Sequence, residues 1–359
     1  MKATLLRPDS AEWHEVLASV RHDFYHLPEY VKFAARRQDV GEPHAFVAEE
    51  SGSVFFLPLI VRRVPAALDE GRAPLFDATG PRGYPGPLVS VRDGRDSSSF
   101  VDRAVGVLAG SLRERGVVSA YVRLHPLLTP PLGSSEHDGS IREHGSSVSV
   151  DLTVPDAEQW RRVEHGHRLG ISKALRNGYR ARCDETWERF DDFVSVYQQS
   201  MKRLQAAPFH HHSAGYFLDL RAALGRHVQL LVVERGDELA SAGLFTETDG
   251  LVEYHLSGTA DSYVHGSPSK LLVDFARRWA ASRGNRVLHL GGSLRPGDSL
   301  AQFKTGFSPL CHQVRSWRLV ADRASYDGMV ARAVRLNSAS GQFDPGYFPA
   351  YRAPLGAPA

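Results

Sequence analysis

A lysine between two phenylalanines lies near the end of this 359-residue chain. Lys304 falls between Phe303 and Phe307, on a stretch whose spacing predicts one short helical turn. The apolar strand expected at 286–290 ends just before it at the glycine pair 291–292, where backbone without a Cβ can approach a ligand closely. A lysine in this place can bring a positive charge to an oxyanion or a phosphate. The alternative is a lysine whose stem packs on the two rings while its amine reaches water.

A histidine in an otherwise apolar strand is the second candidate for chemistry. His255 lies in the strand expected at 251–259. Because imidazole titrates near neutral pH, His255 can accept a proton or bind the acceptor substrate. The alternative is a core histidine that bonds to the backbone.

Nucleophile and nucleotide motifs are absent from the sequence. It contains neither Gly-x-Ser-x-Gly nor a Walker loop, so ATP-driven ligation is disfavoured. An amide-forming enzyme of this kind would need an acyl group that arrives already activated, together with a bound amine and charge stabilisation. Cys183 and Cys311 lack the spacing of a disulfide framework or a metal site. Three consecutive histidines at 210–212 cannot converge on one ion, so no metal is predicted, and the loop around His211 is expected to line the substrate cleft.

Basic residues concentrate in one segment, although the formal net charge of the chain is only +2. Any nucleic-acid contact must therefore come from a local patch. The candidate residues for binding phosphates are Lys173, Arg176, Arg180 and Lys270. The alternative is a solvated helix face, as in most charge runs.

Hydrophobic periodicity predicts an α/β protein with helices at 10–20, 25–37, 97–115, 190–204 and 326–336 and strands at 44–50, 54–64, 117–125, 147–154, 179–183, 227–234 and 239–248. One helix is expected over 156–177, and a long polar loop over 127–145. Ser267 and Pro268 are expected as the N-cap and first residue of a helix that ends at Gly284.

The two halves of the chain repeat the same succession of elements. Arg115-Gly116 followed by a strand ending at His125 parallels Arg283-Gly284 followed by a strand containing His289. This indicates an internal duplication. The expected parts are a first unit at 1–154, a second unit at 155–320, and a C-terminal helix and tail at 321–359 that pack back on the first unit.

The segment His-Leu-Gly-Gly-Ser followed by Asp-Ser-Leu-Ala-Gln-Phe-Lys-Thr-Gly-Phe at 289–307 resembles the closing motif of the Fem-type (FemABX) aminoacyl and peptidyl transferases of the GNAT superfamily. The resemblance extends to most of the chain. It implies two tandem GNAT-like units with a cleft between them. It also implies that Lys304 lies in the channel that receives the charged acceptor end of tRNA.

The resemblance assigns further residues to the substrate cleft. The loop 81–87 resembles the Gly-Pro loop that lines the acceptor site in Fem-type proteins, so Arg82 and Tyr84 are candidates for binding an anionic or sugar-like group. Arg123, at a strand end, is expected to face the same cleft. Arg203 matches a helix of the family. For Arg82, Tyr84 and Arg123 the alternative is turn architecture.

The implied function is an N-aminoacyltransferase (EC 2.3) that uses the acceptor stem of aminoacyl-tRNA as donor and a small-molecule amine of antibiotic biosynthesis or peptidoglycan synthesis as acceptor, with no cofactor. One alternative is an acyl-CoA-dependent N-acyltransferase of cell-envelope or polysaccharide modification. Against coenzyme A, the turn 263–270 has a single glycine, and Pro268 removes a donor N–H. A second alternative is a catalytically silent binding protein.

Targeting signals and membrane spans are not expected. The N-terminus lacks the apolar core of a signal peptide, and no run of 18 apolar residues occurs. These features predict a cytoplasmic protein without membrane insertion. The sequence carries no indication of the oligomeric state.

Overall fold

The computed structural model describes residues 1–37, 41–69, 74–92, 97–132, 139–293, 297–337 and 346–353. The chain divides into two compact units. Unit 1 comprises residues 1–144 and 314–359, and unit 2 comprises residues 145–313. No helix in the described part of the chain is both long and apolar enough to cross a bilayer.

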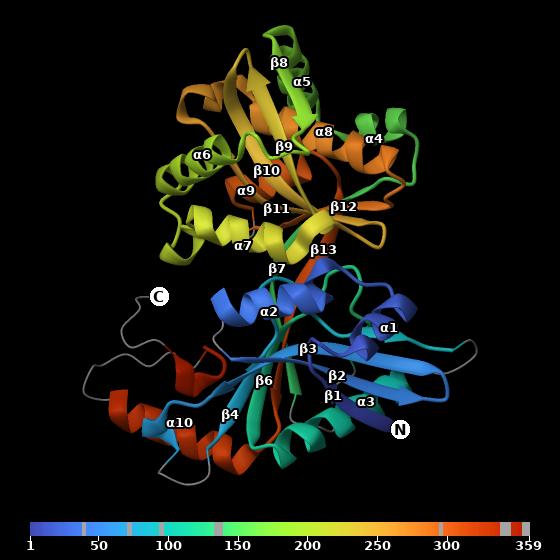
Figure 1. The fold of residues 1–359 in the computed structure, drawn as a ribbon, viewed down its shortest axis with the longest axis vertical. Helices are drawn as coiled ribbons and strands as arrows, with labels where there is room; N and C mark the ends of the chain where they lie inside the picture. Colours follow the sequence, from blue (N-terminus) through green and yellow to red (C-terminus); the bar gives the residue numbers. More distant parts are fainter. Residues whose placement is uncertain are drawn as a thin grey trace. The chain divides into compact units, whose positions relative to one another are not determined.

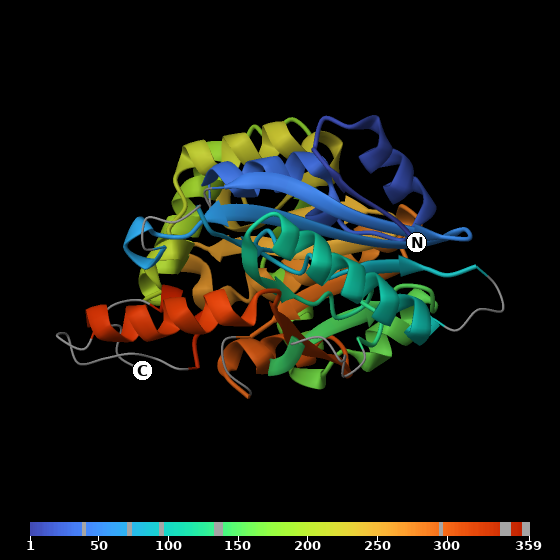
Figure 2. The same cartoon turned by 90° about the horizontal axis from the view of Figure 1, so that it is seen from below.

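Unit 1 combines a mixed sheet with helices on its faces (Figure 1). Its elements are β1 (Lys2–Leu6), α1 (Ala11–Ser19), η1 (Phe24–His26), α2 (Pro28–Arg37), β2 (Glu42–Glu50), β3 (Ser53–Arg63), η2 (Ala66–Leu68), β4 (Phe76–Thr79), β5 (Leu88–Ser90), α3 (Ser97–Glu114), β6 (Val117–Arg123), α10 (Arg323–Asn337) and η6 (Ala350–Arg352). Helices α1 and α2 lie on one side of this sheet and α3 on the other, and Figure 2 shows the side that carries α3 and α10.

Unit 2 has the same kind of architecture. Its elements are α4 (Asp156–Arg162), α5 (His165–Arg176), β8 (Tyr179–Cys183), α6 (Phe190–Arg203), η3 (Pro208–His210), α7 (Ala214–Leu224), η4 (Gly225–His227), β9 (Val228–Arg235), β10 (Glu238–Thr248), β11 (Leu251–Thr259), η5 (Asp261–Gly266), α8 (Pro268–Ser282), β12 (Val287–Gly292) and α9 (Ser299–Thr305). Strands β7 (Gly139–Asp151) and β13 (Leu310–Val320) each cross a boundary between the units.

The strand orders of the two units are equivalent. In unit 1 the order is β1-β2-β3-β4-β6-β13, and in unit 2 it is β8-β9-β10-β11-β12-β7. In both units the fourth and fifth strands of this order pair in parallel, β4 with β6 and β11 with β12. The other neighbouring strands in both orders pair antiparallel. The duplication inferred from the sequence is therefore present in the topology.

The closing strand of each sheet comes from a distant part of the sequence. β7 follows β6 in the chain, yet its residues 147–151 pair with β12 of unit 2. β13 follows α9, yet its residues 316–320 pair with β6 of unit 1. The unit boundaries consequently fall inside these strands, at 144/145 and 313/314, rather than at the expected 154/155 and 320/321.

Each unit has its own apolar core. In unit 1, Phe46, Phe55 and Leu57 of the sheet pack with Phe100 and Leu108 of α3. A second cluster joins α10 to the same unit through Tyr326, Met329 and Ala333. In unit 2 the core gathers side chains from β7 to β12, from α5 and α8, and from Phe307.

Two local elements differ from the expectation, and one expected helix start is confirmed. The polar loop expected over 127–145 includes residues 133–138, which lie outside the described residues, but 139–145 belongs to strand β7. Strand β13 was not expected at all. Ser267 is the N-cap of α8 and Pro268 its first residue, as expected, although Ser267 is in the left-handed region, with φ of 60°, and its side chain makes no capping bond.

The single helix expected over 156–177 is in fact two helices. Val163 and Glu164 interrupt it, and the N–H of Glu164 donates to the carbonyl of Gly306 at 2.8 Å. Arg168 donates to the carbonyls of Val163 and Arg161, which the helix end leaves available. Tertiary bonds thus replace helical ones at the break.

Candidate active site in unit 2

Lys304 is a buried lysine that faces the end of a strand. It lies in α9, which begins where the carboxylate of Asp298 accepts a bond from the N–H of Ala301 at 2.7 Å. The side chain of Lys304 is 7% exposed, and its Nζ donates to the carbonyl of Gly292. The alternative of a lysine whose amine reaches water therefore does not describe this structure.

Glycines make room for this arrangement. Gly291 has φ of 72°, a conformation that L side chains rarely adopt, and an added Cβ there would lie 3.5 Å from Nζ of Lys304. At the other end of α9, a Cβ on Gly306 would come within 2.4 Å of the His167 ring. His167 contacts both phenylalanines of the motif and bonds through Nε2 to the carbonyl of Phe303 at 2.9 Å. The Phe-Lys-x-Gly-Phe segment is therefore fixed by α5 and β12 within unit 2.

Burial changes the acidity of Lys304. Desolvation lowers its pKa from 10.5 to about 8, against the opposing charges of Glu253 and Asp298. The ammonium form still predominates at pH 7. A small rise in pH produces a free amine, so the group can stabilise negative charge or hold a proton near neutrality.

A buried carboxylate and imidazole lie in the two parallel strands that precede α9. Glu253 of β11 is opposite His289 of β12 in the register, and their side chains are 1% and 0% exposed. Nδ1 of His289 and Oε1 of Glu253 are 2.6 Å apart. Sequence reasoning missed this pair, because only the register of the strands brings the two residues together. An acidic residue inside an apolar strand was the one available signal.

His255, the second predicted catalytic residue, lies at an irregularity of the sheet. Phe245 of β10 is opposite Tyr254 and Leu244 is opposite Leu256, so the register skips His255. Such bulges turn a side chain out of the regular alternation and are frequent beside active sites. The side chain of His255 is half-buried. Its role stays a prediction.

Arg203 and His211 are held within unit 2 by local bonds. Arg203 pairs with Asp261 and donates to the carbonyl of Thr259 at 3.1 Å, so it braces the loop that follows β11. His211 is exposed and bonds through Nε2 to the carbonyl of Ala206 at 3.0 Å. These bonds do not involve Lys304, and the substrate roles of both residues stay predictions.

The predicted anion-binding residues cluster around α5. Lys173 and Arg176 are exposed on this helix, and the exposed Arg180 on β8 donates to the carbonyl of Leu175 at 3.2 Å. Lys270, in the first turn of α8, approaches the carbonyl of Gly166 at 3.5 Å. These residues form a basic surface on unit 2, and their binding roles stay predictions.

The loop that leads into α8 is covered by its neighbours. A Cβ on Gly266 would lie 2.2 Å from the hydroxyl of Tyr179, and a Cβ on Gly170 would lie 3.1 Å from Oγ of Ser267. The Tyr179 side chain of β8 and the backbone of α5 at Gly170 therefore lie directly against the turn. Pro268 at the start of the helix offers no N–H.

Unit 1 carries the remaining predicted residues on the loop 81–87 and at the end of β6. The guanidinium of Arg123 lies 5.0 Å from the centre of the Tyr84 ring. The hydroxyl of Tyr30 donates to the carbonyl of Arg82 at 2.6 Å, and Nε2 of His26 lies 3.0 Å from the carbonyl of Gly86. The loop 81–87 is thus anchored through its backbone. Arg82, Tyr84 and Arg123 are close in one unit, and their binding roles stay predictions.

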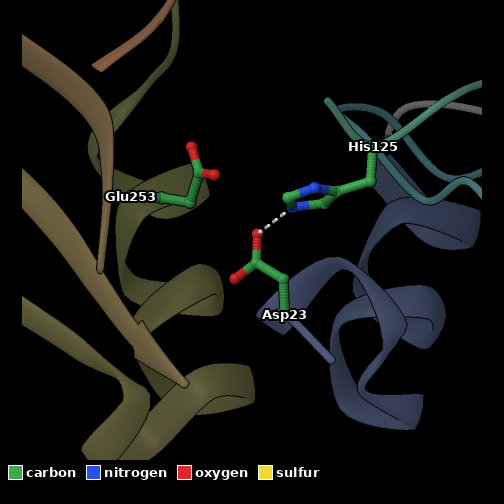
Figure 3. A group of neighbouring side chains, drawn as sticks. All are labelled: Asp23, His125 and Glu253. Atoms are coloured by element: carbon green, nitrogen blue, oxygen red, sulfur yellow. Dashed lines mark hydrogen bonds and ion pairs between the residues drawn. The ribbon is translucent and has the colours of Figure 1, made fainter. Parts of the chain in front are cut away.

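A second buried carboxylate–imidazole pair supports this loop. Nε2 of His125 and Oδ2 of Asp23 are 3.3 Å apart, and both residues are fully buried within unit 1 (Figure 3). The N–H of Leu127 donates to Nδ1 of His125 at 3.1 Å, so the proton of a neutral His125 lies on Nε2, toward Asp23. Burial and the nearby His125 lower the pKa of His26 to about 3, so His26 is neutral.

Known proteins share this architecture. Residues 161–305 match the family described as an acetyltransferase (GNAT) domain, a range that contains Glu253, His289 and Lys304. The chain is similar to the crystal structure of FemX, at 12% identity and a TM-score of 0.67, over 91% of this chain and 99% of that one. A search of curated proteins finds no match to the sequence.

Two further structures are similar to this chain. L-PGS from Bacillus licheniformis has 12% identity and a TM-score of 0.53, over 92% of this chain and 97% of that one. The C-terminal domain of a putative lysylphosphatidylglycerol synthetase from Agrobacterium fabrum has 15% identity and a TM-score of 0.51, over 83% and 90%. The expected α/β class and the resemblance to Fem-type proteins are confirmed at the level of the fold. Residues 161–305 thus match the acetyltransferase (GNAT) family, within a chain whose fold is similar to that of FemX.

Proposed function

We propose that this protein is an N-aminoacyltransferase that transfers the amino acid of an aminoacyl-tRNA to the amine of a small molecule. The observation that carries the proposal is Lys304, a buried ammonium at a Gly-Gly strand end, in a chain with the fold of FemX. The similarity to the domain of a putative lysylphosphatidylglycerol synthetase supports aminoacyl rather than acetyl transfer.

In the proposed reaction the amine nitrogen attacks the carbonyl carbon of the aminoacyl ester. The C–N bond forms, and the C–O bond to the tRNA ribose breaks with its electron pair left on the ribose oxygen. The amine loses one proton and the ribose oxygen gains one. The ammonium of Lys304 stabilises the negative charge on the carbonyl oxygen, or holds a phosphate of the donor.

The acceptor is proposed to be an amine of antibiotic biosynthesis or of a cell-wall precursor. Arg82, Tyr84 and Arg123 of unit 1 would bind its anionic or sugar-like part. Lys173, Arg176, Arg180 and Lys270 would contact phosphates of the tRNA acceptor stem. With a formal net charge of +2, such contacts are local and sensitive to salt.

A donor bound as coenzyme A thioester is the alternative, because the family matched by residues 161–305 is described as an acetyltransferase. The packing of Tyr179 and α5 on the turn before α8 disfavours it. A pyrophosphate at a helix N-terminus needs free backbone N–H groups and space beside them. Here Pro268 removes one N–H, and neighbouring side chains fill the space.

The test is to incubate the protein with charged tRNA pools and with small-molecule amines extracted from the cells that carry the gene. Mass spectrometry then identifies which aminoacyl ester is consumed and which amide appears. We expect one or a few amino acids to move to an acceptor, and the product to disappear after RNase treatment. A product that survives RNase, or one that forms from acyl-CoA alone, would refute the tRNA donor.

A further inference from the structure

One buried pair of polar residues in unit 2, Glu253 and His289, has no role in the reaction proposed above. Glu253 and His289 are almost completely buried and bonded to each other at 2.6 Å. A carboxylate is costly to bury unless another charge or hydrogen bonds compensate it. A pair that served the core alone could be replaced by apolar residues at little cost, so its presence here needs a reason.

The pair lies next to the strand end that holds Lys304. His289 and Gly292 belong to the same strand, β12, and Gly292 supplies the carbonyl to which Nζ of Lys304 donates. Glu253 is the strongest of the charges that oppose the desolvation of this ammonium. His289 thus shares strand β12 with the carbonyl that holds Lys304, and it bonds to Glu253 on the neighbouring strand β11.

The other groups around Lys304 cannot replace Glu253. Asp298, at the start of the helix that carries Lys304, opposes the desolvation of Lys304 less strongly than Glu253 does. Its Oδ1 accepts a hydrogen bond from the N–H of Ala301. From α5, His167 packs on the same segment, but its Nε2 bonds to the carbonyl of Phe303. From β12, Gly292 contributes a neutral carbonyl.

We propose that Glu253 is the counter-charge that keeps Lys304 an ammonium group inside unit 2, and that His289 fixes the orientation of Glu253. Both are positioning residues that act through Lys304. The contribution of Glu253 and His289 to catalysis rests on the proposed function, whereas their effect on the charge of Lys304 does not. The effect on catalysis and the effect on charge can therefore be tested separately.

The experiment titrates Lys304 directly. The chain has six lysines, so selective 13Cε labelling of lysine yields six NMR signals, and the one lost in Lys304→Arg is assigned to Lys304. The wild-type midpoint is expected near pH 8. Glu253→Gln is expected to lower this midpoint by about 1 pH unit or more, because a partner of opposite charge favours the charged form. Glu253→Asp, which keeps the charge, is expected to restore part of the shift.

A matched control uses another partly buried carboxylate of the same unit. Glu247 on β10 pairs with Arg283 and is not among the charges that act on Lys304. Glu247→Gln should therefore leave the Lys304 midpoint in place. If Glu253→Gln does not fold, His289→Gln is titrated instead. That variant retains the carboxylate but changes its partner, and a lower midpoint is expected.

An unchanged midpoint in folded Glu253→Gln, or in folded His289→Gln when it replaces that variant, would overturn the inference. The kinetic arm separates this result from a failure of the proposed function. If the wild type transfers from aminoacyl-tRNA, Glu253→Gln is expected to lower kcat about tenfold near pH 8. KM should stay within about twofold of wild type, because the substitution changes the charge of Lys304 and not substrate binding. If the Lys304 midpoint shifts but the protein transfers nothing from aminoacyl-tRNA, the inference about Glu253 and His289 holds and the proposed tRNA donor is refuted.

Discussion

Units 1 and 2 have equivalent strand orders, and each buries one carboxylate–imidazole pair. In unit 1 the pair is Asp23 with His125, just past the end of β6. In unit 2 it is Glu253 with His289, in the two strands that occupy the equivalent parallel positions. Only unit 2 adds a buried lysine, since both lysines of unit 1, Lys2 and Lys32, reach solvent.

This difference teaches that a duplicated framework can be divided between two tasks. The pair of unit 1 lies beside an anchored loop whose backbone carbonyls bind Tyr30 and His26, so we assign it a structural role. The pair of unit 2 lies near the ammonium of Lys304, whose pKa is near 8, so we assign it the role of stabilising that charge. We expect mutations in unit 2 to change the rate of the chemical step, and mutations in unit 1 to change folding and acceptor binding.

The largest effect is expected from Lys304→Ala. Removal of a charge that stabilises a developing oxyanion lowers kcat by about 10²–10³-fold. The measurement is the steady-state rate of amide formation once donor and acceptor are known. Lys202→Ala removes an exposed lysine of α6 and should leave the rate unchanged. If Lys304→Ala kept more than half of the wild-type kcat, the claim that the chemical step depends on Lys304 of unit 2 would be contradicted.

The second effect concerns the pair of unit 1. Asp23→Ala removes a buried carboxylate that accepts from the N–H of Phe24 and pairs with His125. We expect a loss of about 3 kcal/mol in the free energy of unfolding, because the remaining buried partner is left uncompensated. Denaturant unfolding measures it, and hydrogen exchange should assign the loss to unit 1. Asp9→Ala, at an exposed ion pair with Lys32, should cost less than about 1 kcal/mol. Equal losses in both variants would contradict a special role for the buried pair.

The third effect is a gain of stability from Lys304→Met. The folded-state pKa of Lys304, about 8, lies below its unfolded value of 10.5. Between these two values the unfolded chain binds more protons than the folded chain, so the wild type gains stability as pH rises through that window. Lys304→Met lacks this term. It should be more stable than wild type by about 1–3 kcal/mol below pH 8, a difference that fades by about pH 10.5.

Thermal or denaturant unfolding of both proteins between pH 6 and pH 10.5 measures this difference. A variant that is less stable than wild type across the whole range would show that the ammonium is well compensated in the fold. It would also show that the low pKa has another cause.

The smallest effect is expected from Arg123→Ala in unit 1. Loss of the guanidinium beside Tyr84 should raise KM for the acceptor about tenfold and leave kcat nearly unchanged, because uniform binding energy is removed. Arg115→Ala removes an exposed arginine that bonds to Ser111, and it serves as control. A fall in kcat without a change in KM would place Arg123 in the chemical step and so erase the contrast between the units.

Much of the fold could be predicted from the sequence, because most strands and helices have clear apolar periodicity. The meander β9–β11 and helices α3, α6 and α8 lie within a few residues of their expected bounds. The misses have physical causes. Helix 156–177 breaks because Glu164 bonds to Gly306, and β13 escaped notice because its partner, β6, is far away in the sequence.

The site was predictable where a motif carried it and hidden where only register makes it. Lys304 was identified from its flanking phenylalanines and the Gly-Gly pair. Glu253 and His289 are 36 residues apart and meet only because β11 and β12 pair in parallel. A single sequence does not state this register. His255, two residues away, drew attention instead, because a histidine in an apolar strand is more conspicuous than an acid near its start.

The most direct test of the account offers two labelled donors to one acceptor pool in the same reaction. Aminoacyl-tRNA carries a tritiated amino acid, and acetyl-CoA carries a 14C acetyl group. The account predicts tritium alone in the amide product, at a level that Lys304→Ala reduces about 10²-fold or more and that RNase abolishes. A product that carries 14C alone, or that forms equally with Lys304→Ala, would contradict it.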